Sequence, residues 1–344
     1  MLSNDRKLIA VVGATGQQGG AVVRALQASG QFKVRALTRN PGKHRDLAEE
    51  VVEADLDRPE SLKAAFEGAH GVFLVTNFWE PGTDELKQAT AAVRAAKDAG
   101  VKHLIWSTLP DVGAISGGKL HVPHFTGKAN VDRIVEEARF PYHTFVIAPF
   151  FYQNLVGALA PHQQEDGTMG WALPIDPTVR GIHMGDITEI GNIVAGAFAH
   201  PDKAGNGEYL PLVGDFMSFN EIVDTLNRQG HKFSFKQVPT EVFATLFPGA
   251  AEVAATFRYF QAHTVPGFRF ARPDCACKRN CRQATKQSRD LGPSEIPGSF
   301  VEWQRQPIAF VGYGGLGVVG HSDCMSCPQA PPKPCFLRQS DATR

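Results

Sequence analysis

The chain has 344 residues, of which 43% are hydrophobic and 20% are charged, and its 35 basic and 35 acidic side chains give a formal net charge of zero. This length accommodates one large domain or two, and the balanced charge provides no general attraction to nucleic acid or to an anionic membrane. No apolar run reaches the roughly 18 residues of a membrane span, and residues 1–7 lack the apolar segment of a signal peptide, so we expect a cytoplasmic protein.

A glycine-rich segment follows the first apolar run, residues 8–12. It reads GATGQQGG, with Gly13, Gly16 and Gly19 at a spacing of three. This pattern is typical of a strand, a tight turn and a helix whose N-terminus cradles a dinucleotide pyrophosphate. The first glycine allows the turn, the second lets backbone N–H groups approach phosphates, and the third lets the helix pack on the strand. The spacing is GxxGxxG rather than GxGxxG, and a plain strand-to-helix turn is the alternative.

The second predicted strand, residues 32–37, ends where a dinucleotide site holds the adenosine ribose. An acidic residue at this distance would bind the 2′-hydroxyl of NAD, but the sequence there is Thr38-Arg39-Asn40. The Arg39 guanidinium suits a 2′-phosphate, and Lys43 adds a second cation. The pattern therefore favours NADP(H) over NAD(H), with a solvated turn as the alternative.

Strands and helices continue to alternate along the first half of the chain. The further predicted strands are 50–54, 71–75, 103–107 and 142–147, and the predicted helices are 21–29, 59–67, 84–99 and 128–138. Most of these strands are apolar on both faces, as in a parallel sheet covered by helices on each side. We predict an α/β fold, a Rossmann-type doubly wound parallel sheet with a smaller α/β C-terminal domain.

The carboxyl ends of such strands share one edge, where ligands of this architecture bind. We expect Asp55 and Leu56 near the adenine, and Thr76, Asn77 and Phe78 along the cofactor. Ordinary loop packing is the alternative reading.

The catalytic pattern of short-chain dehydrogenases is incomplete. Those enzymes pair a tyrosine with a lysine four residues later, whereas residues 124–128 read HFTGK. A desolvated Lys128 would be able to act as a general base, and His124 to supply a proton, but we favour hydrogen bonding of Lys128 to a nicotinamide ribose. His121 and His124 form an HxxH pair without a nearby third ligand, so we predict no metal site.

Six short motifs share an order along the chain. They are GATGQQGG at 13–20, TNFWE at 76–80, HFTGK at 124–128, APFFYQN at 148–154, LFPGA at 246–250 and TFRYF at 256–260. Together the motifs resemble the NmrA-like family, a branch of the atypical short-chain dehydrogenases and reductases, and the last two resemble its NADPH-sensor subgroup. The resemblance extends from residue 6 to residue 265.

The resemblance implies an NADP(H)-binding redox sensor or negative transcriptional regulator that changes its affinity for a regulatory protein, such as a transcription factor, without turnover. A homodimer is left open. The alternatives are an NADPH-dependent reductase of quinones or aromatic carbonyls that uses Lys128 as its base, and a scaffold that has lost the cofactor. The implied cofactor contacts are Gly13, Ala14, Thr15, Gly16, Gln17, Gln18, Gly19, Arg39, Lys43, Asp55, Leu56, Thr76, Asn77, Phe78, Lys87, Lys128, Phe151, Tyr152, Gln153 and Asn154. In the motif APFFYQN, the Tyr152 ring would stack on the nicotinamide and the Asn154 amide would bond a ribose or carboxamide group, with a packed loop as the alternative.

We divide the chain into an NADP-binding domain (1–155), a smaller domain that closes the cleft and is partly interleaved with the first (156–306), and a tail (307–344) that we expect to be poorly ordered. In the smaller domain, residues 161–180 are rich in loop formers, residues 208–213 form a predicted strand, and residues 218–229 form a predicted helix with a capping box. All six cysteines lie between residues 275 and 335, where we expect reduced thiols, with a zinc site or redox switch as the alternative.

Overall fold

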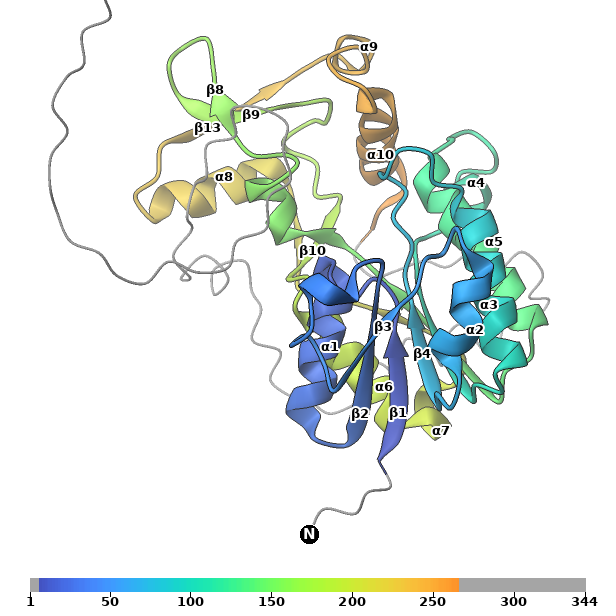
Figure 1. Cartoon of the computed structure of the whole chain (residues 1–344). Helices are drawn as coiled ribbons and strands as arrows, with labels where there is room; N and C mark the ends of the chain where they lie inside the picture. The colour runs from blue at the N-terminus through green and yellow to red at the C-terminus, as the bar shows by residue number, and fades with distance from the viewer. Residues whose placement is uncertain (1–5, 266–344) are drawn as a thin grey trace, which may run out of the picture. The chain divides into compact units, whose positions relative to one another are not determined.

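The computed structural model describes residues 6–265, so the predictions for the cysteine-containing segment and the tail lie outside the described residues. A seven-stranded parallel sheet, ordered β11-β6-β5-β4-β1-β2-β3, organises this part of the chain (Figure 1). Its strands are β1 (Lys7–Val11), β2 (Phe32–Thr38), β3 (Glu50–Glu53), β4 (Gly71–Leu74), β5 (His103–Thr108), β6 (Tyr142–Ile147) and β11 (Asn206–Pro211). The strand order reverses between β1 and β4, which is the switch point where ligands of doubly wound sheets bind.

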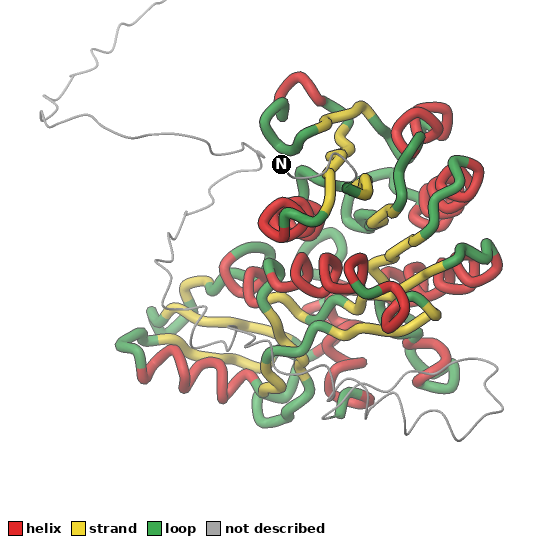
Figure 2. The backbone as a smooth tube through the Cα atoms, turned by 90° about the horizontal axis from the view of Figure 1, so that it is seen from below, coloured by secondary structure: helices red, strands yellow, loops and turns green. Residues whose placement is uncertain are grey.

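Helices cover both faces of this sheet (Figure 2). They are α1 (Gln17–Ser29), α2 (Pro59–Phe66), α3 (Glu85–Asp98), α5 (Pro123–Glu137), α6 (Glu189–Ala199) and α7 (Pro201–Ala204), and the short helices η1 (Pro41–Lys43) and α4 (Val112–Ile115) lie in the connecting segments. Alternate residues of one strand face opposite cores. Ile9 and Val11 join the cluster that contains α1 and α6, whereas Ala10 and Val12 join the cluster that contains α2, α3 and α5. This two-sided burial confirms the parallel doubly wound sheet predicted from strands that are apolar on both faces.

A smaller part carries two three-stranded sheets and a third hydrophobic core. The first sheet, ordered β12-β10-β7, contains β7 (Phe150–Phe151), β10 (Ile182–Gly185) and β12 (Asp215–Met217), and the second, ordered β13-β9-β8, contains β8 (His162–Gln163), β9 (Met169–Leu173) and β13 (Phe233–Gln237). Its helices are η2 (Tyr152–Val156), α8 (Phe219–Arg228), α9 (Thr240–Phe243) and α10 (Ala250–His263). No helix within residues 6–265 is long and apolar enough to cross a bilayer.

Two features of the smaller part differ from the sequence predictions. Strand β9 lies inside the segment expected to be mostly loop, because Trp171 and Leu173 are buried there and pair with β13, more than 60 residues later. Strand β11, predicted at 208–213, runs from 206 to 211 and lies beside β6 in the main sheet. The predicted capping box at the start of α8 is confirmed, since Ser218 and Glu221 bond each other's backbone N–H groups.

A buried carboxyl on α5 makes stability depend on pH. Burial raises the pKa of Asp132 to about 7, although its Oδ2 accepts a hydrogen bond from the Tyr209 hydroxyl at 2.9 Å. The unfolded chain titrates this group near its ordinary value, so the folded state binds the extra proton between pH 4 and pH 7. Stability from this group is therefore lost as pH rises through that window, by on the order of 4 kcal/mol.

We expect Asp132→Asn to flatten this part of the pH profile, because an amide does not ionise. Urea denaturation between pH 4 and pH 8 measures the effect. The variant should gain stability over the unsubstituted protein as pH rises. Parallel profiles for the two proteins would show that Asp132 stays ionised in the folded state.

Candidate functional site

The glycine-rich loop joins β1 to α1 through a close backbone approach. Gly13 has φ +65°, a left-handed conformation that favours glycine, and a Cβ on Gly19 would lie 2.1 Å from the Gly13 carbonyl oxygen. Helix α1 begins at Gln17 and carries no acidic residue in its first turn, so no carboxylate offsets the positive end of the helix. The loop and the helix therefore have the predicted form, and their free N–H groups suit an anion.

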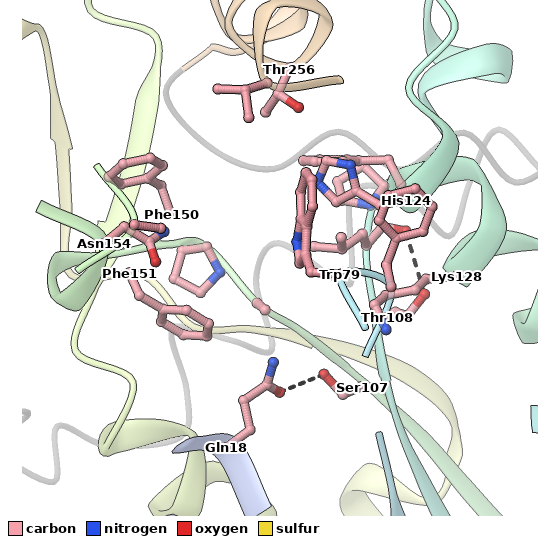
Figure 3. Close-up of a pocket in the computed structure, with 18 of the residues that line it drawn as sticks. Gln18, Trp79, Ser107, Thr108, His124, Lys128, Phe150, Phe151, Asn154 and Thr256 are labelled. Atoms are coloured by element: carbon pink, nitrogen blue, oxygen red, sulfur yellow. Dashed lines mark hydrogen bonds between the residues drawn. The ribbon is translucent and has the colours of Figure 1, made fainter. Parts of the chain in front are cut away.

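A cavity of about 700 Å³ opens beside this loop. Figure 3 shows Phe150, Phe151 and Asn154 on one side and Trp79 with His124 on the other. The Ser107 hydroxyl, at the end of β5, donates a hydrogen bond of 2.7 Å to Gln18 Oε1 of α1 at its base (Figure 3). Thr256 of α10 lines the far end. The wall is mostly apolar and aromatic, as expected of a site for a small organic molecule.

The structure brings about half of the predicted cofactor contacts to this cavity. Those that line it are Gly13, Gly16, Gln17, Gln18, Gly19, Thr76, Asn77, Phe78, Lys128, Phe151 and Asn154. Those that do not line it are Ala14, Thr15, Arg39, Lys43, Asp55, Leu56, Lys87, Tyr152 and Gln153.

The expectation that the Tyr152 ring stacks on a nicotinamide is wrong. Tyr152 is 0% exposed and packs in the core of the smaller part, where its hydroxyl donates a hydrogen bond to Asp215. Gln153 is also occupied, because its side chain donates to Asp186 and accepts from the backbone N–H of Ile187. Neither side chain lines the cavity, because the chain turns into the short helix η2 here, and of residues 151–154 only Phe151 and Asn154 line it.

The remaining predicted contacts outside the cavity lie at different depths. Ala14 is buried in the core beside α1, and Thr15 is exposed on the loop. Lys87 is exposed in the first turn of α3, as expected of an ordinary surface lysine. Lys43 is exposed in η1, four residues after Arg39.

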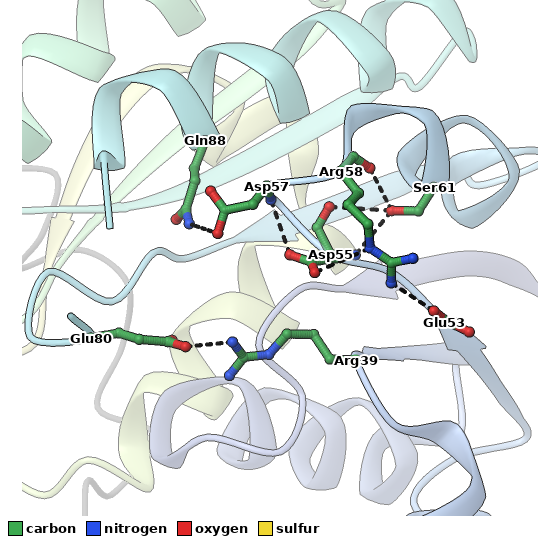
Figure 4. A network of polar contacts seen from close by, with 8 residues as sticks. All are labelled: Arg39, Glu53, Asp55, Asp57, Arg58, Ser61, Glu80 and Gln88. Carbon is green, nitrogen blue, oxygen red and sulfur yellow. Dashed lines mark hydrogen bonds and ion pairs between the residues drawn. The ribbon is translucent and has the colours of Figure 1, made fainter. Parts of the chain in front are cut away.

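The predicted 2′-phosphate site is held by ion pairs (Figure 4). Arg39, at the end of β2, pairs with Glu80 from the segment after β4. This hydrogen bond raises the pKa of the Arg39 guanidinium, and the nearby Asp55 and Asp57 add to the attraction. The structure confirms that Arg39 directly follows β2, as predicted, whereas its carboxylate partner was not foreseen.

Asp55 is fixed by its own network in the same region (Figure 4). Its carboxylate accepts a hydrogen bond from the backbone N–H of Asp57 at 3.0 Å and one from Arg58 Nε at 3.3 Å. Its backbone N–H donates to Ser61 at 3.0 Å. Asp55 and Leu56 are therefore at the predicted edge of the sheet, in a rigid turn before α2.

Lys128 lies at a buried junction of four elements. Its Nζ donates to the Thr76 carbonyl at 2.9 Å, to Thr76 Oγ1 at 3.0 Å and to Glu85 Oε1 of α3 at 2.7 Å. It also lies 5.2 Å from the centre of the Trp106 ring of β5. Lys128 is only 8% exposed, and burial lowers the pKa of its ammonium while Glu85 opposes that effect. All three ammonium protons have partners, which is the arrangement of a structural ion pair rather than of a free base.

His124 forms a second charged contact, which sequence reasoning missed. Its ring Nδ1 and its backbone N–H both bond Glu252 Oε1 of α10, the latter at 2.9 Å. The His124 ring lies 5.3 Å from the ring of Trp79 and 4.7 Å from that of Phe125. Glu252 is 128 residues away in the chain, and no local pattern marks it as a partner.

Other cavity residues were not assigned as cofactor contacts from the sequence. Ser107 was expected on the edge of the sheet where ligands bind, because it stands at a predicted strand end, and it lines the cavity. The apolar residues of α10 look like ordinary core residues in sequence. Within residues 6–265, no group of three or more His, Cys, Asp or Glu side chains is placed to hold a metal ion.

Known proteins resemble this chain in sequence. A sequence model of the NmrA-like family matches residues 5–288. An NmrA-like family domain-containing protein of Dictyostelium discoideum is 30% identical over 240 residues, which cover 66% of this chain and 78% of that protein. The NmrA-like family domain-containing oxidoreductase notA of an Aspergillus species is 29% identical over 256 residues, covering 66% and 74%.

Solved structures resemble it in fold. NmrA, a negative transcriptional regulator crystallised with NADP, superposes with a TM-score of 0.66 at 24% identity over 84% of this chain and 91% of that one. The Citrobacter sp. triphenylmethane reductase complexed with NADP(H) superposes with a TM-score of 0.60 at 23% identity, over 74% of this chain and 90% of that chain. At these identities the likeness establishes the shared Rossmann-like fold.

The Lys128 junction yields a prediction about stability. Lys128→Met should destabilise the protein by about 3–5 kcal/mol, because it leaves the Glu85 carboxylate buried without its cation. Glu85→Gln in the same chain removes that charge, so the double variant should cost much less than the sum of the two single changes. Urea unfolding of all four proteins at pH 7 measures the coupling. Additive costs would mean that the two side chains do not depend on each other.

Proposed function

The chain belongs to the NmrA-like family, and from this membership and the site geometry we propose that it binds NADP(H) and reduces a planar conjugated carbonyl or quinone. One observation carries the proposal. The cavity that borders the glycine-rich loop is continuous with a large aromatic surface, so a cofactor and an apolar acceptor have room side by side.

The loop residues fit a dinucleotide. Gly13 and Gly19 leave no side chain between the loop backbone and the start of α1, and Gln17 and Gln18 line the cavity at that point. Arg39 and Lys43 lie at the end of β2 and just beyond it, where a 2′-phosphate would be bound in this architecture. The structural relatives NmrA and triphenylmethane reductase were crystallised with NADP and NADP(H).

The aromatic surface fits a flat acceptor. Phe150 and Trp79 belong to opposite walls, and Phe257 and Phe260 of α10 line the end away from the glycines. Bound NADPH supplies a hydride, and these side chains exclude water and hold the acceptor by stacking and burial. The name of the relative notA, an oxidoreductase, supports this class of reaction.

The structure changes the role that we assign to Lys128. The reductase alternative drawn from the sequence used Lys128 as the base, but its ammonium already donates to Thr76 and Glu85. We propose instead that Lys128 holds the segment after β4 against α5, so that Asn77 and Phe78 keep their place along the cofactor.

Sensing without turnover is the second candidate, and the Arg39 contact favours it. A 2′-phosphate would have to displace Glu80 from Arg39, and Glu80 follows Trp79 directly. Trp79 is 53% exposed, so a change in this segment would reach a surface that a partner protein can contact.

An assay of NADPH oxidation separates the two candidates, and a binding titration tests the cofactor that both require. The reductase should oxidise NADPH, followed by absorbance, in the presence of at least one member of a panel of quinones and aromatic ketones or aldehydes. Calorimetric titration with NADPH, NADP and NAD should show binding that prefers the phosphorylated cofactors. Tight binding without oxidation of any acceptor would overturn the reductase and leave the sensor, and no binding would overturn both.

The Arg39 pair yields a prediction about cofactor preference. Arg39→Gln should weaken NADP(H) binding about tenfold or more, since it removes a charge-assisted contact to the 2′-phosphate. Glu80→Gln should strengthen NADP(H) binding, because the phosphate no longer competes with a carboxylate. NAD(H), which lacks this phosphate, is the control and should change little with either variant. Equal effects on both cofactors would contradict the assignment.

A further inference from the structure

His124 and Glu252 form a carboxylate and histidine pair on the cavity wall. The Nδ1 atom of the imidazole bonds Glu252 Oε1, which is an acceptor, so Nδ1 carries a proton and donates it. Both side chains are 12% exposed, and the rings of Phe78, Trp79 and Phe125 surround the imidazole. The carboxylate therefore fixes both the tautomer and the orientation of the ring.

The other ring nitrogen is the one left for a ligand. Within residues 6–265, His124 Nε2 has no hydrogen-bond partner, and this atom is not fully buried. His124 itself lines the cavity, one helical turn before Lys128, and Figure 3 shows it beside Trp79 and across the cavity from Phe150. Nε2 is therefore the ring nitrogen that remains for a molecule in the cavity, whereas all three protons of the Lys128 ammonium already have acceptors.

We propose that His124 is the proton donor of the reduction and that Glu252 is its positioning residue. This inference rests on the proposed reductase function. As a hydride bonds to the carbonyl carbon of the acceptor, the C=O π bond breaks and its electron pair takes the proton from His124 Nε2. The products are the alcohol, the oxidised cofactor and a neutral imidazole that recovers its proton from water. With a quinone, the hydride bonds to one carbonyl oxygen, the displaced electron pair moves through the ring to the other oxygen, and that oxygen takes the proton to give the hydroquinone. Glu252 keeps its hydrogen bond to the Nδ1 proton and so holds the ring in place as the other proton leaves Nε2.

Glu252 has a structural use that the test must separate from this one. Its carboxylate also accepts from the backbone N–H of His124 in the first turn of α5, where free N–H groups and the helix dipole favour an anion. A carboxylate that only capped the helix would affect stability, but it would not determine which ring nitrogen carries the proton.

The first test measures which nitrogen of the His124 ring carries the proton, and it requires no turnover. Nuclear magnetic resonance of protein with ¹⁵N-labelled histidine shows which ring nitrogen carries the proton, and comparison with His124→Gln assigns the His124 signals. At a pH where the ring is neutral, we expect the proton on Nδ1. In Glu252→Leu the proton should shift toward Nε2, the form that free histidine prefers. A neutral His124 that carries its proton on Nε2 in the unsubstituted protein would overturn the proposal.

The second test is kinetic. His124→Gln should lower kcat by about 10²-fold or more with an unchanged Kd for NADPH, and added imidazole should restore part of the rate in His124→Ala. Glu252→Gln keeps an oxygen acceptor for both N–H groups but loses the charge, so we expect a smaller fall in kcat at unchanged folding. His121→Gln is the matched control, because His121 is an exposed neighbour that does not line the cavity.

The outcomes separate the two proposals. If the unsubstituted protein reduces an acceptor and His124→Gln does so at the same rate, the proton donor is wrong and the reductase stands. If the unsubstituted protein binds NADPH and reduces nothing, the reductase is wrong and the proton-donor assignment falls with it. Thermal melting of each variant shows that a lost rate does not come from a lost fold.

Discussion

The buried ion pair between Lys128 and Glu85 holds together the wall on which the rest of the site depends. It joins α5, α3 and Thr76 at the end of β4, over the Trp106 ring of β5. Trp79 follows Thr76 by three residues, and His124 precedes Lys128 by one helical turn. Two charges withdrawn from water add little net stability, but separating them is costly. The pair therefore fixes the position of these segments more than it strengthens the fold.

This use of the lysine has a chemical consequence. Because the Lys128 ammonium already donates to three acceptors, it is poorly placed to transfer a proton, and the proposed reduction would depend on a group with an unbonded nitrogen. His124 is such a group, and its carboxylate partner comes from α10, in the smaller part of the structure. Phe257 and Phe260 of α10 line the cavity and also belong to the hydrophobic core of that part. The wall of the cavity therefore forms only when that core is packed. Site and fold are in this way connected through one helix.

Local pattern was enough to predict what depends on near neighbours. The strands of the main sheet followed from apolar runs, the loop from the spacing of Gly13 and Gly19, and the α8 cap from Ser218 and Glu221. Long-range partners were invisible for a physical reason. The contact of His124 with Glu252 exists because two helices pack together, and the sequence of either helix shows only an ordinary surface or core residue. The inward turn of Tyr152 likewise depends on a core assembled from residues far along the chain.

The two regions that suit phosphate differ in whether a carboxylate already occupies them. The glycine-rich loop offers backbone N–H groups at a helix start without a carboxylate nearby, so an anion meets no competitor there. Arg39 lies among Glu80, Asp55 and Asp57, and a 2′-phosphate at that position would exchange one ion pair for another. The difference in binding free energy between NADP(H) and NAD(H) is then the difference between a guanidinium paired with phosphate and one paired with carboxylate. This difference is smaller than the attraction between the phosphate and an unpaired guanidinium. In the proposed site, affinity for the dinucleotide as a whole and preference for its phosphorylated form would therefore arise from different parts of the sheet edge, and substitutions would change one without the other.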